Sequence, residues 1–127
     1  VSTDGIIEEI ANKNNNNYSE TFKQVDFKEI DRQFKIDMNS IYASGQSMII
    51  DQTNMSIKSR RKKLNFNNVI KICIEIKCDE AVRQNRLEKR AEETGKYIPV
   101  RVSESMISSY EKPEYSEGFD KIYVIES

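Results

Sequence analysis

The stretch VSTDGIIEEI (residues 1–10) decides how this chain is interpreted, because it has the form of a strand that ends at a helix. A short apolar start gives way to Ser-Thr-Asp-Gly, and isoleucines then recur at helical spacing. Asp4 is positioned to cap the predicted helix over residues 5–13. A strand that turns directly into a helix is typical of α/β domains, so we expect a strand to lead into Val1.

Helix and strand patterns alternate along the rest of the chain. The run NKNNNNYSE predicts a polar loop, and Gly45 ends the long helix that follows it. The most strongly predicted strand is VIKICIEIK, which is rich in β-branched residues. We predict a helix over residues 19–44, with an apolar repeat at Phe27, Ile30, Phe34, Met38 and Ile41, and further helices over residues 56–64, 80–93, where Asp79 is the cap, and 102–112. We predict strands that end at Asp51 and that cover residues 69–77 and 120–126. The alternation predicts one α/β domain over residues 1–127, with a parallel sheet and helices on both faces.

Composition restricts the classes of function. The 20 basic and 21 acidic residues give a net charge of −1. This balance argues against a protein that binds along nucleic acid through its overall charge, but not against one that binds a single nucleic-acid end. The chain has no His, so acid–base chemistry must fall to carboxylates or Lys. Cys73 and Cys78 favour reduced thiols over a disulfide or half a zinc site. No signal peptide or membrane-spanning run is found, which predicts a cytoplasmic protein without a membrane partner.

The segment MIIDQTN (residues 48–54) is the first candidate for a site. A strand that ends in Asp51 brings a carboxylate to the carboxyl edge of the sheet, where α/β folds bind ligands. Thr53 and Asn54 offer a hydroxyl and an amide close by. Asp4 lies at the same edge if the two strands are neighbours. A strand cap before a turn explains Asp51 equally well, as an N-cap explains Asp4.

Two basic clusters are further candidates. Arg83, Arg86 and Arg90 fall at i, i+3 and i+7, so one helical face presents three guanidiniums, as a phosphate-transfer site requires. A solvated face paired with neighbouring glutamates is the alternative. The cluster SRRKKL, with basic residues 60–63, is consistent with a surface, a localisation-like run or a contact for a polyanion.

Taken in order, these motifs resemble the kinase domain of polynucleotide 5′-hydroxyl kinases and their relatives among P-loop kinases. The matching segments are STDG, IIDQTN, SRR, NRLEKR and YIPVRVSESMISSYEKPEYSEGFDKIYVI, and DQTN and PEYSEGFDKIYVI are the most specific parts. The resemblance runs from Ser2 to about Ile125. It implies a P-loop NTPase-like three-layer sandwich with a parallel sheet.

On the donor side, the resemblance implies ATP and Mg²⁺. Asp51 would lie near the metal ion and the γ-phosphate. Arg86 and Arg90 would occupy the positions of a lid, over about residues 79–99, that clasps the donor phosphates.

On the acceptor side, Asp4 would be the general base that takes the proton of the attacking hydroxyl. Thr53 and Asn54 would lie near the acceptor, and Arg60 from the SRR motif is a further candidate for substrate binding.

The sequence departs from the family pattern in two ways. Members that act on polynucleotides often carry an Arg just after the general base, and Ile6, Ile7 and Glu8 follow here, which leaves the acceptor open. The chain has four Gly and no Gly-x-x-x-x-Gly-Lys-Ser/Thr motif, whose backbone and Lys cradle phosphates. We expect that loop and the first strand, a unit of about 30 residues, to precede Val1.

Three hypotheses follow. The first is an ATP-dependent kinase that phosphorylates the 5′-hydroxyl of a polynucleotide. The second is a kinase of the same fold for a nucleoside or another small hydroxyl compound. The third is a catalytically incomplete relative that serves as a binding or structural module.

Overall fold

The computed structural model describes residues 1–127, which form two compact units. The first unit comprises residues 1–52 and 90–97, and the second comprises residues 53–89 and 98–127. Helix α5 (Glu80–Thr94) contributes residues to both units.

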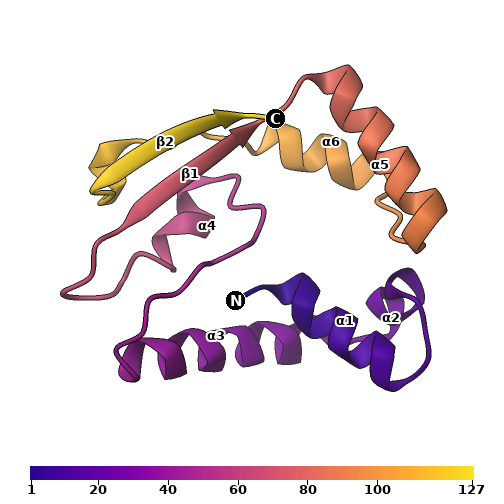
Figure 1. Cartoon of the computed structure of the whole chain (residues 1–127), viewed down its shortest axis with the longest axis horizontal. Helices are drawn as coiled ribbons and strands as arrows, with labels where there is room; N and C mark the ends of the chain where they lie inside the picture. The colour runs from indigo at the N-terminus through magenta and orange to yellow at the C-terminus, as the bar shows by residue number, and fades with distance from the viewer. The chain divides into compact units, whose positions relative to one another are not determined.

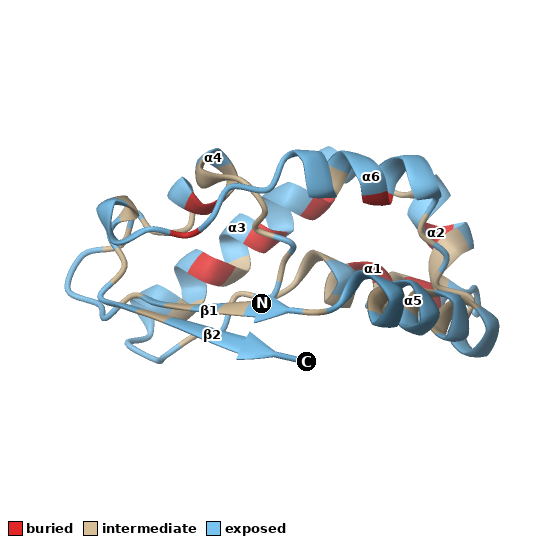
Figure 2. Ribbon diagram, turned by 90° about the horizontal axis from the view of Figure 1, so that it is seen from above, coloured by how far each residue is buried: buried red, intermediate tan, exposed pale blue.

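Three helices build the first unit: α1 (Thr3–Lys13), α2 (Tyr18–Gln24) and α3 (Phe27–Ala43). Helix α1 packs against both α2 and α3 (Figure 1). The buried apolar residues are Ile7 and Ala11 on α1 and Ile30, Phe34 and Met38 on α3, and the ribbons of both helices have red segments in Figure 2. Full burial of one large side chain of this kind contributes about 1.5–3 kcal/mol, so these residues are the main stabilising contacts of the unit.

The N-cap of α1 differs from the prediction. Ser2 has extended backbone and its Oγ accepts a hydrogen bond from the backbone N of Gly5 at 2.8 Å, which makes Ser2 the cap. Asp4 lies inside the first helical turn instead. The prediction of Asp4 as a cap was therefore wrong, and its carboxylate is not used by the helix terminus.

The single helix predicted over residues 19–44 is interrupted. Val25 is extended after α2, and the carboxylate of Asp26 accepts a hydrogen bond from the backbone N of Lys28 at 2.9 Å, which starts α3 as a new helix. The predicted apolar repeat is buried in α3 at Ile30, Phe34 and Met38, whereas Phe27 is 50% exposed. Gly45, with a φ of 75°, follows the end of α3 as expected.

The segment before Asp51 is extended but forms no regular strand. The backbone N of Val1 donates to Ile49 O at 2.6 Å, and the backbone N of Asp51 donates to Val1 O at 2.9 Å. Two such bonds on either side of Ile50 are the pattern of neighbouring parallel strands. Val1 and Ile50 therefore pair, which meets the condition for Asp4 and Asp51 to share an edge, although the ladder is too short to count as a sheet.

The second unit contains a two-stranded parallel sheet. Strand β1 (Ile72–Lys77) pairs with β2 (Lys121–Glu126) in the register Ile72 to Lys121 through Lys77 to Glu126 (Figure 1). The other elements of the unit are α4 (Ile57–Arg61), α6 (Val100–Ser108) and a 3₁₀ turn, η1 (Tyr115–Glu117). Both strands and their parallel pairing were predicted, whereas the covering of both sheet faces by helices stays a prediction.

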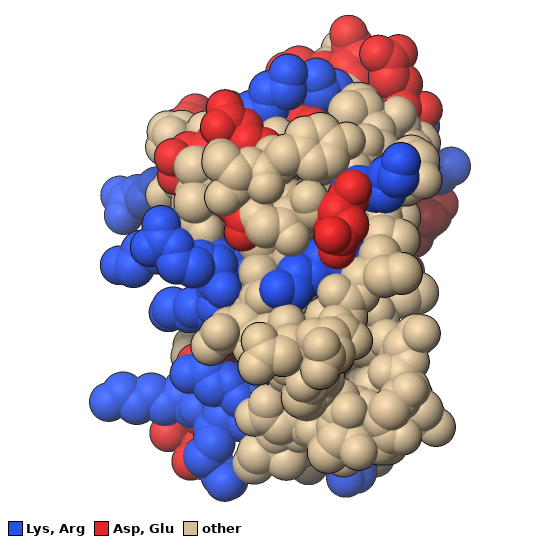
Figure 3. Space-filling view, turned by 90° about the vertical axis from the view of Figure 1, so that its left-hand side faces the viewer, with Lys and Arg blue, Asp and Glu red and all other residues tan.

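The predicted cap at Asp79 is confirmed. Asp79 Oδ1 accepts a hydrogen bond from the backbone N of Ala81 at 3.0 Å at the start of α5. Cys73 and Cys78 are free thiols, although half-buried rather than buried. Both Lys/Arg and Asp/Glu side chains appear on the face drawn in Figure 3, beside a broad area of uncharged residues. None of the helices has the length and apolar character needed to span a membrane.

Candidate functional site

Two carboxylates follow the paired segments of the first unit. Asp4 lies in the first turn of α1, shortly after Val1, and Asp51 directly follows Ile50. Because the two segments run in the same direction, both carboxylates come at the carboxyl end of the pair, the edge at which α/β proteins bind ligands. Both residues are exposed, and neither forms an ion pair.

The carboxylate of Asp4 is held by a tyrosine. The hydroxyl of Tyr18, at the start of α2, donates to Asp4 Oδ1 at 2.6 Å. Partial burial and this hydrogen bond to Asp4 raise the pKa of Tyr18 well above its usual value, so the phenol stays protonated at neutral pH and remains a donor. Asp4 Oδ2 has no hydrogen-bond partner and is free to accept a proton.

Arg90 belongs to the same unit. Its Nε is buried and makes no hydrogen bond. Its positive charge lies near enough to Tyr18 to oppose part of the rise in that pKa. A buried N–H without an acceptor is unfavourable by about 1–3 kcal/mol, and the cost is larger for a charged group, so an anion that accepted this N–H would relieve it.

The segment that follows α5 is attached to α2 around Tyr18. The ammonium of Lys96 forms an ion pair with Glu8 and lies 4.9 Å from the centroid of the Tyr18 ring. The hydroxyl of Ser19 bonds to the carbonyl of Gly95 and accepts from the backbone N of Tyr97 at 3.2 Å. Sequence reasoning missed these residues, since nothing local to them signals contacts between segments so distant along the chain.

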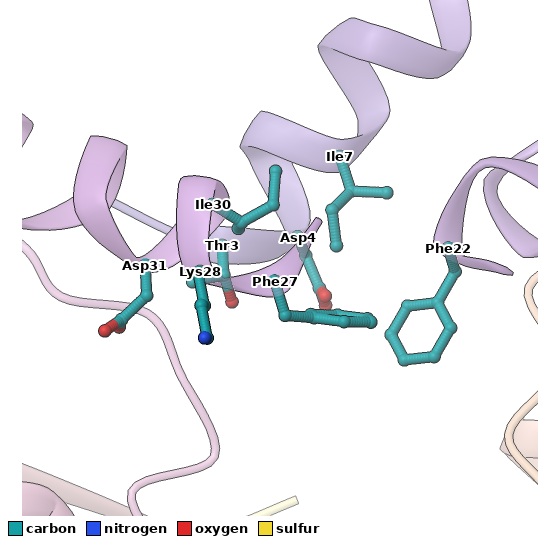
Figure 4. A pocket seen from close by; sticks show the side chains of 8 residues that line it. All are labelled: Thr3, Asp4, Ile7, Phe22, Phe27, Lys28, Ile30 and Asp31. Atoms are coloured by element: carbon teal, nitrogen blue, oxygen red, sulfur yellow. The ribbon is translucent and has the colours of Figure 1, made fainter. Parts of the chain in front are cut away.

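A hollow of about 440 Å³ opens beside Asp4. Figure 4 shows the rings of Phe22 and Phe27 next to each other, with Asp4 and Ile7 on the α1 side of them. The two ring centroids are 4.9 Å apart at an interplanar angle of 69°, an edge-to-face contact. The residues lining the hollow are Thr3, Asp4, Ile7, Phe22, Phe27, Lys28, Ile30 and Asp31. Sequence reasoning placed Phe27 and Ile30 only on the buried stripe of a helix.

In the second unit, Arg60 does not have the role that was expected of it. Its guanidinium side chain is 6% exposed and bonds to both carboxylate oxygens of Glu117, at 2.8 and 3.1 Å. The remaining N–H groups donate to the carbonyls of Asn54, Met55 and Glu111 at 2.8–3.1 Å. All five donors are thus used inside the protein, and we correct the interpretation of Arg60 from a substrate contact to a structural ion pair.

The other predicted residues of the second unit are more accessible. Thr53 is exposed, and the side-chain oxygen of Asn54 accepts from Lys63 Nζ. Arg86 is exposed and donates to Ser127 Oγ at 2.7 Å and to Cys78 Sγ at 3.6 Å. Arg83 forms the ion pair with Glu80 that the solvated-face alternative predicted, at 2.6 Å.

The chain belongs to the AAA domain family, which it matches over residues 1–113. This family is of the P-loop NTPase type and includes kinases, and its members generally bind ATP or a related nucleotide with Mg²⁺. The chain is therefore a P-loop nucleotide-binding, kinase-like domain. The most specific segment of the resemblance, PEYSEGFDKIYVI, lies almost entirely beyond the matched residues. No curated protein matches the chain.

Proposed function

We propose that this domain belongs to an ATP-dependent phosphotransferase that transfers the γ-phosphate of ATP to a hydroxyl, with the 5′-hydroxyl of a polynucleotide as the acceptor. The observation that carries the proposal is the pair of exposed carboxylates, Asp4 and Asp51, at the carboxyl end of two parallel-paired segments. Membership of a P-loop family that includes kinases supports the same reaction class.

Asp4 is the general base of the proposed reaction. The acceptor oxygen forms a bond to the γ-phosphorus, the bond from that phosphorus to the bridging oxygen breaks, and ADP leaves. The proton of the acceptor passes to Asp4 Oδ2, while Tyr18 holds Oδ1. A base of this kind contributes about 10²–10⁴-fold to the rate.

Asp51 and the two lid arginines serve the donor. Mg²⁺ binds through one or two carboxylates together with substrate phosphates and waters, so a single exposed carboxylate such as Asp51 fits it. The metal ion would neutralise charge on the β- and γ-phosphates. Arg86 and Arg90 contact the transferring phosphate, and the unpartnered Nε of Arg90 supports that assignment. Thr53 and Asn54 contact the acceptor.

A nucleoside or another small hydroxyl compound is the second candidate acceptor. The hollow beside Asp4 favours it, because its walls are mainly apolar and of a size that accommodates a small molecule. The absence of an Arg directly after Asp4 points in the same direction.

The test is Asp4→Asn in the complete gene product, assayed with labelled ATP, a 5′-hydroxyl oligonucleotide and a set of nucleosides. We expect transfer to fall by about 100-fold or more while ATP binding persists. The fold should survive, because Ser2 and not Asp4 caps α1. Glu9→Gln, on the exposed side of the same helix, is the matched control and should retain full transfer. An Asp4→Asn variant that transfers phosphate at the normal rate would remove Asp4 from the mechanism, and a wild type with no transfer to any acceptor would favour a binding or structural module.

A further inference from the structure

The hollow between α1, α2 and α3 has features that the proposed phosphate transfer alone does not explain. Phe22 and Phe27 are 44% and 50% exposed, although Phe27 belongs to a helix whose apolar residues Ile30, Phe34 and Met38 are buried. Ile7 and Ile30, which also line the hollow, are 2% and 5% exposed. The hollow is therefore lined by buried aliphatic side chains and by two exposed aromatic rings, which is the composition of a ligand pocket.

The two rings leave an aromatic surface available. In an edge-to-face pair, the edge of one ring meets one face of the other. Phe22 also makes a tilted contact with Tyr18, with ring centroids 5.9 Å apart, whereas the ring of Phe27 contacts Phe22 alone, so Phe27 keeps a face available. A planar heterocycle stacks on such a face with little dependence on its identity, because every base has a π-face. Aliphatic side chains alone would not favour a flat ligand in this way.

The polar side chains at the hollow indicate which polar or charged groups a ligand could carry beside its flat ring. Asp31 forms an ion pair with Lys35 at 3.3 Å, and the hydroxyl of Thr3 accepts from Gln52 at 3.4 Å. Lys28 forms no ion pair and is exposed, so it offers a positive charge. Asp4 offers the carboxylate oxygen that Tyr18 leaves free.

We propose that this hollow binds the planar base of the phosphate acceptor, with the base stacked on Phe27 beside Phe22 and the acceptor hydroxyl directed toward Asp4. This inference rests on the proposed function and adds to it the place that holds the acceptor, a nucleoside-like group with a hydroxyl beside a flat ring. The same chemistry is found in a free nucleoside and in the 5′-terminal residue of an oligonucleotide. Lys28 distinguishes the two, because only the oligonucleotide brings a phosphate to that side of the ring.

Steady-state kinetics on the complete gene product test the inference, with ATP as donor and with thymidine and a 5′-hydroxyl oligothymidylate as acceptors. We expect Phe27→Ala to raise KM for both acceptors by about fivefold or more, as loss of base–aromatic stacking does, and to leave KM for ATP unchanged. Phe27→Tyr keeps the ring and should restore the acceptor KM. Ile36→Ala is the matched control, since Ile36 is 45% exposed on the same helix and does not line the hollow.

Lys28→Gln identifies the source of the acceptor. If the oligonucleotide is the acceptor, the substitution raises its KM and weakens its salt dependence while the KM of thymidine is unchanged. If thymidine alone is phosphorylated and Phe27→Ala still raises its KM, the pocket is supported with a nucleoside as its ligand. An acceptor KM that is the same in wild type and Phe27→Ala overturns the inference, and if Asp4→Asn abolishes transfer in the same assays the kinase proposal still stands.

A binding measurement keeps the inference testable if the wild type transfers no phosphate. The probe is 2-aminopurine riboside, whose fluorescence falls when the base stacks on an aromatic ring. Quenching by wild type and by Phe27→Tyr, but not by Phe27→Ala, would support the pocket without the kinase reaction. Equal quenching by all three proteins, or by none, would refute it.

Discussion

Replacing Glu117 by Gln should destabilise the protein strongly, because Glu117 neutralises a buried arginine. The side chains of Arg60 and Glu117 are 6% and 5% exposed, and two hydrogen bonds of 2.8 and 3.1 Å join them. In Glu117→Gln, an amide N–H₂ group replaces one of these acceptors and the positive charge of Arg60 stays buried. Removing one partner of a buried ion pair costs about 3–5 kcal/mol. Arg60 keeps three carbonyl acceptors, so we expect a loss near the lower limit.

Chemical denaturation and thermal melting of the variant measure this loss. For a chain of this length, about 3 kcal/mol corresponds to a fall in Tm of roughly 10 °C. Glu29→Gln is the matched control: its partner Arg32 also lies at 2.9 Å, but the two side chains are 61% and 63% exposed. A surface pair of this kind contributes about 0–1 kcal/mol, so the control should hardly change. A double variant, Arg60→Met with Glu117→Gln, should be more stable than Glu117→Gln alone.

The difference between wild type and Glu117→Gln should also depend on pH. Burial raises the pKa of Glu117, but the hydrogen bond from Arg60, a backbone N–H and the arginine charge outweigh it, and the pKa is lowered overall. A carboxyl with a lowered folded pKa stabilises the protein above its unfolded pKa of about 4.3, and this stabilisation is lost as the pH falls through the folded pKa. The difference in the free energy of unfolding between wild type and Glu117→Gln should therefore have its full size at pH 7 and decrease below about pH 4. A loss of stability in Glu117→Gln of less than about 1 kcal/mol at pH 7, or a loss that stays the same below about pH 4, would refute the reasoning.

Two further substitutions test the first unit in the complete gene product. Arg90→Ala should lower turnover by about 10³-fold or more while the far-UV circular dichroism stays unchanged, because the Nε of Arg90 has no protein acceptor to lose. Turnover within a few-fold of wild type would show that Arg90 does not contact the transferring phosphate. Tyr18→Phe should lower kcat about tenfold with an unchanged KM for ATP, because Asp4 loses the 2.6 Å bond that orients it. A change in KM with an unchanged kcat would give Tyr18 a role in packing instead.

Local patterns in the sequence determined several elements correctly. The apolar repeat of α3, the β-branched runs of β1 and β2, the cap at Asp79 and the stop at Gly45 all depend on residues that are close along the chain. The motifs STDG, DQTN and NRLEKR lie within the region that matches the AAA domain family. The class of a P-loop nucleotide-binding, kinase-like domain could therefore be predicted without any coordinates.

The long helix predicted over residues 19–44 is an instructive failure. Its apolar spacing is compatible with one helix, but Asp26 can either continue the helix or cap a new one, and propensity barely separates the two. The same ambiguity affected Ser2 and Asp4, since both residue types are good caps. Packing of α1 against α2 and α3 is what selects among locally equivalent choices.

The tertiary structure alone decided the contacts between distant residues. The bond from Tyr18 to Asp4 and the hollow beside it depend on how α2 and α3 return to α1. Arg60 resembled a surface cation in sequence, and its burial became possible only because Glu117 and three carbonyls supply acceptors for all five of its donors. A sequence pattern reports the balance of forces among near neighbours, whereas burial of a charge is decided by partners that only the folded chain brings within hydrogen-bond distance.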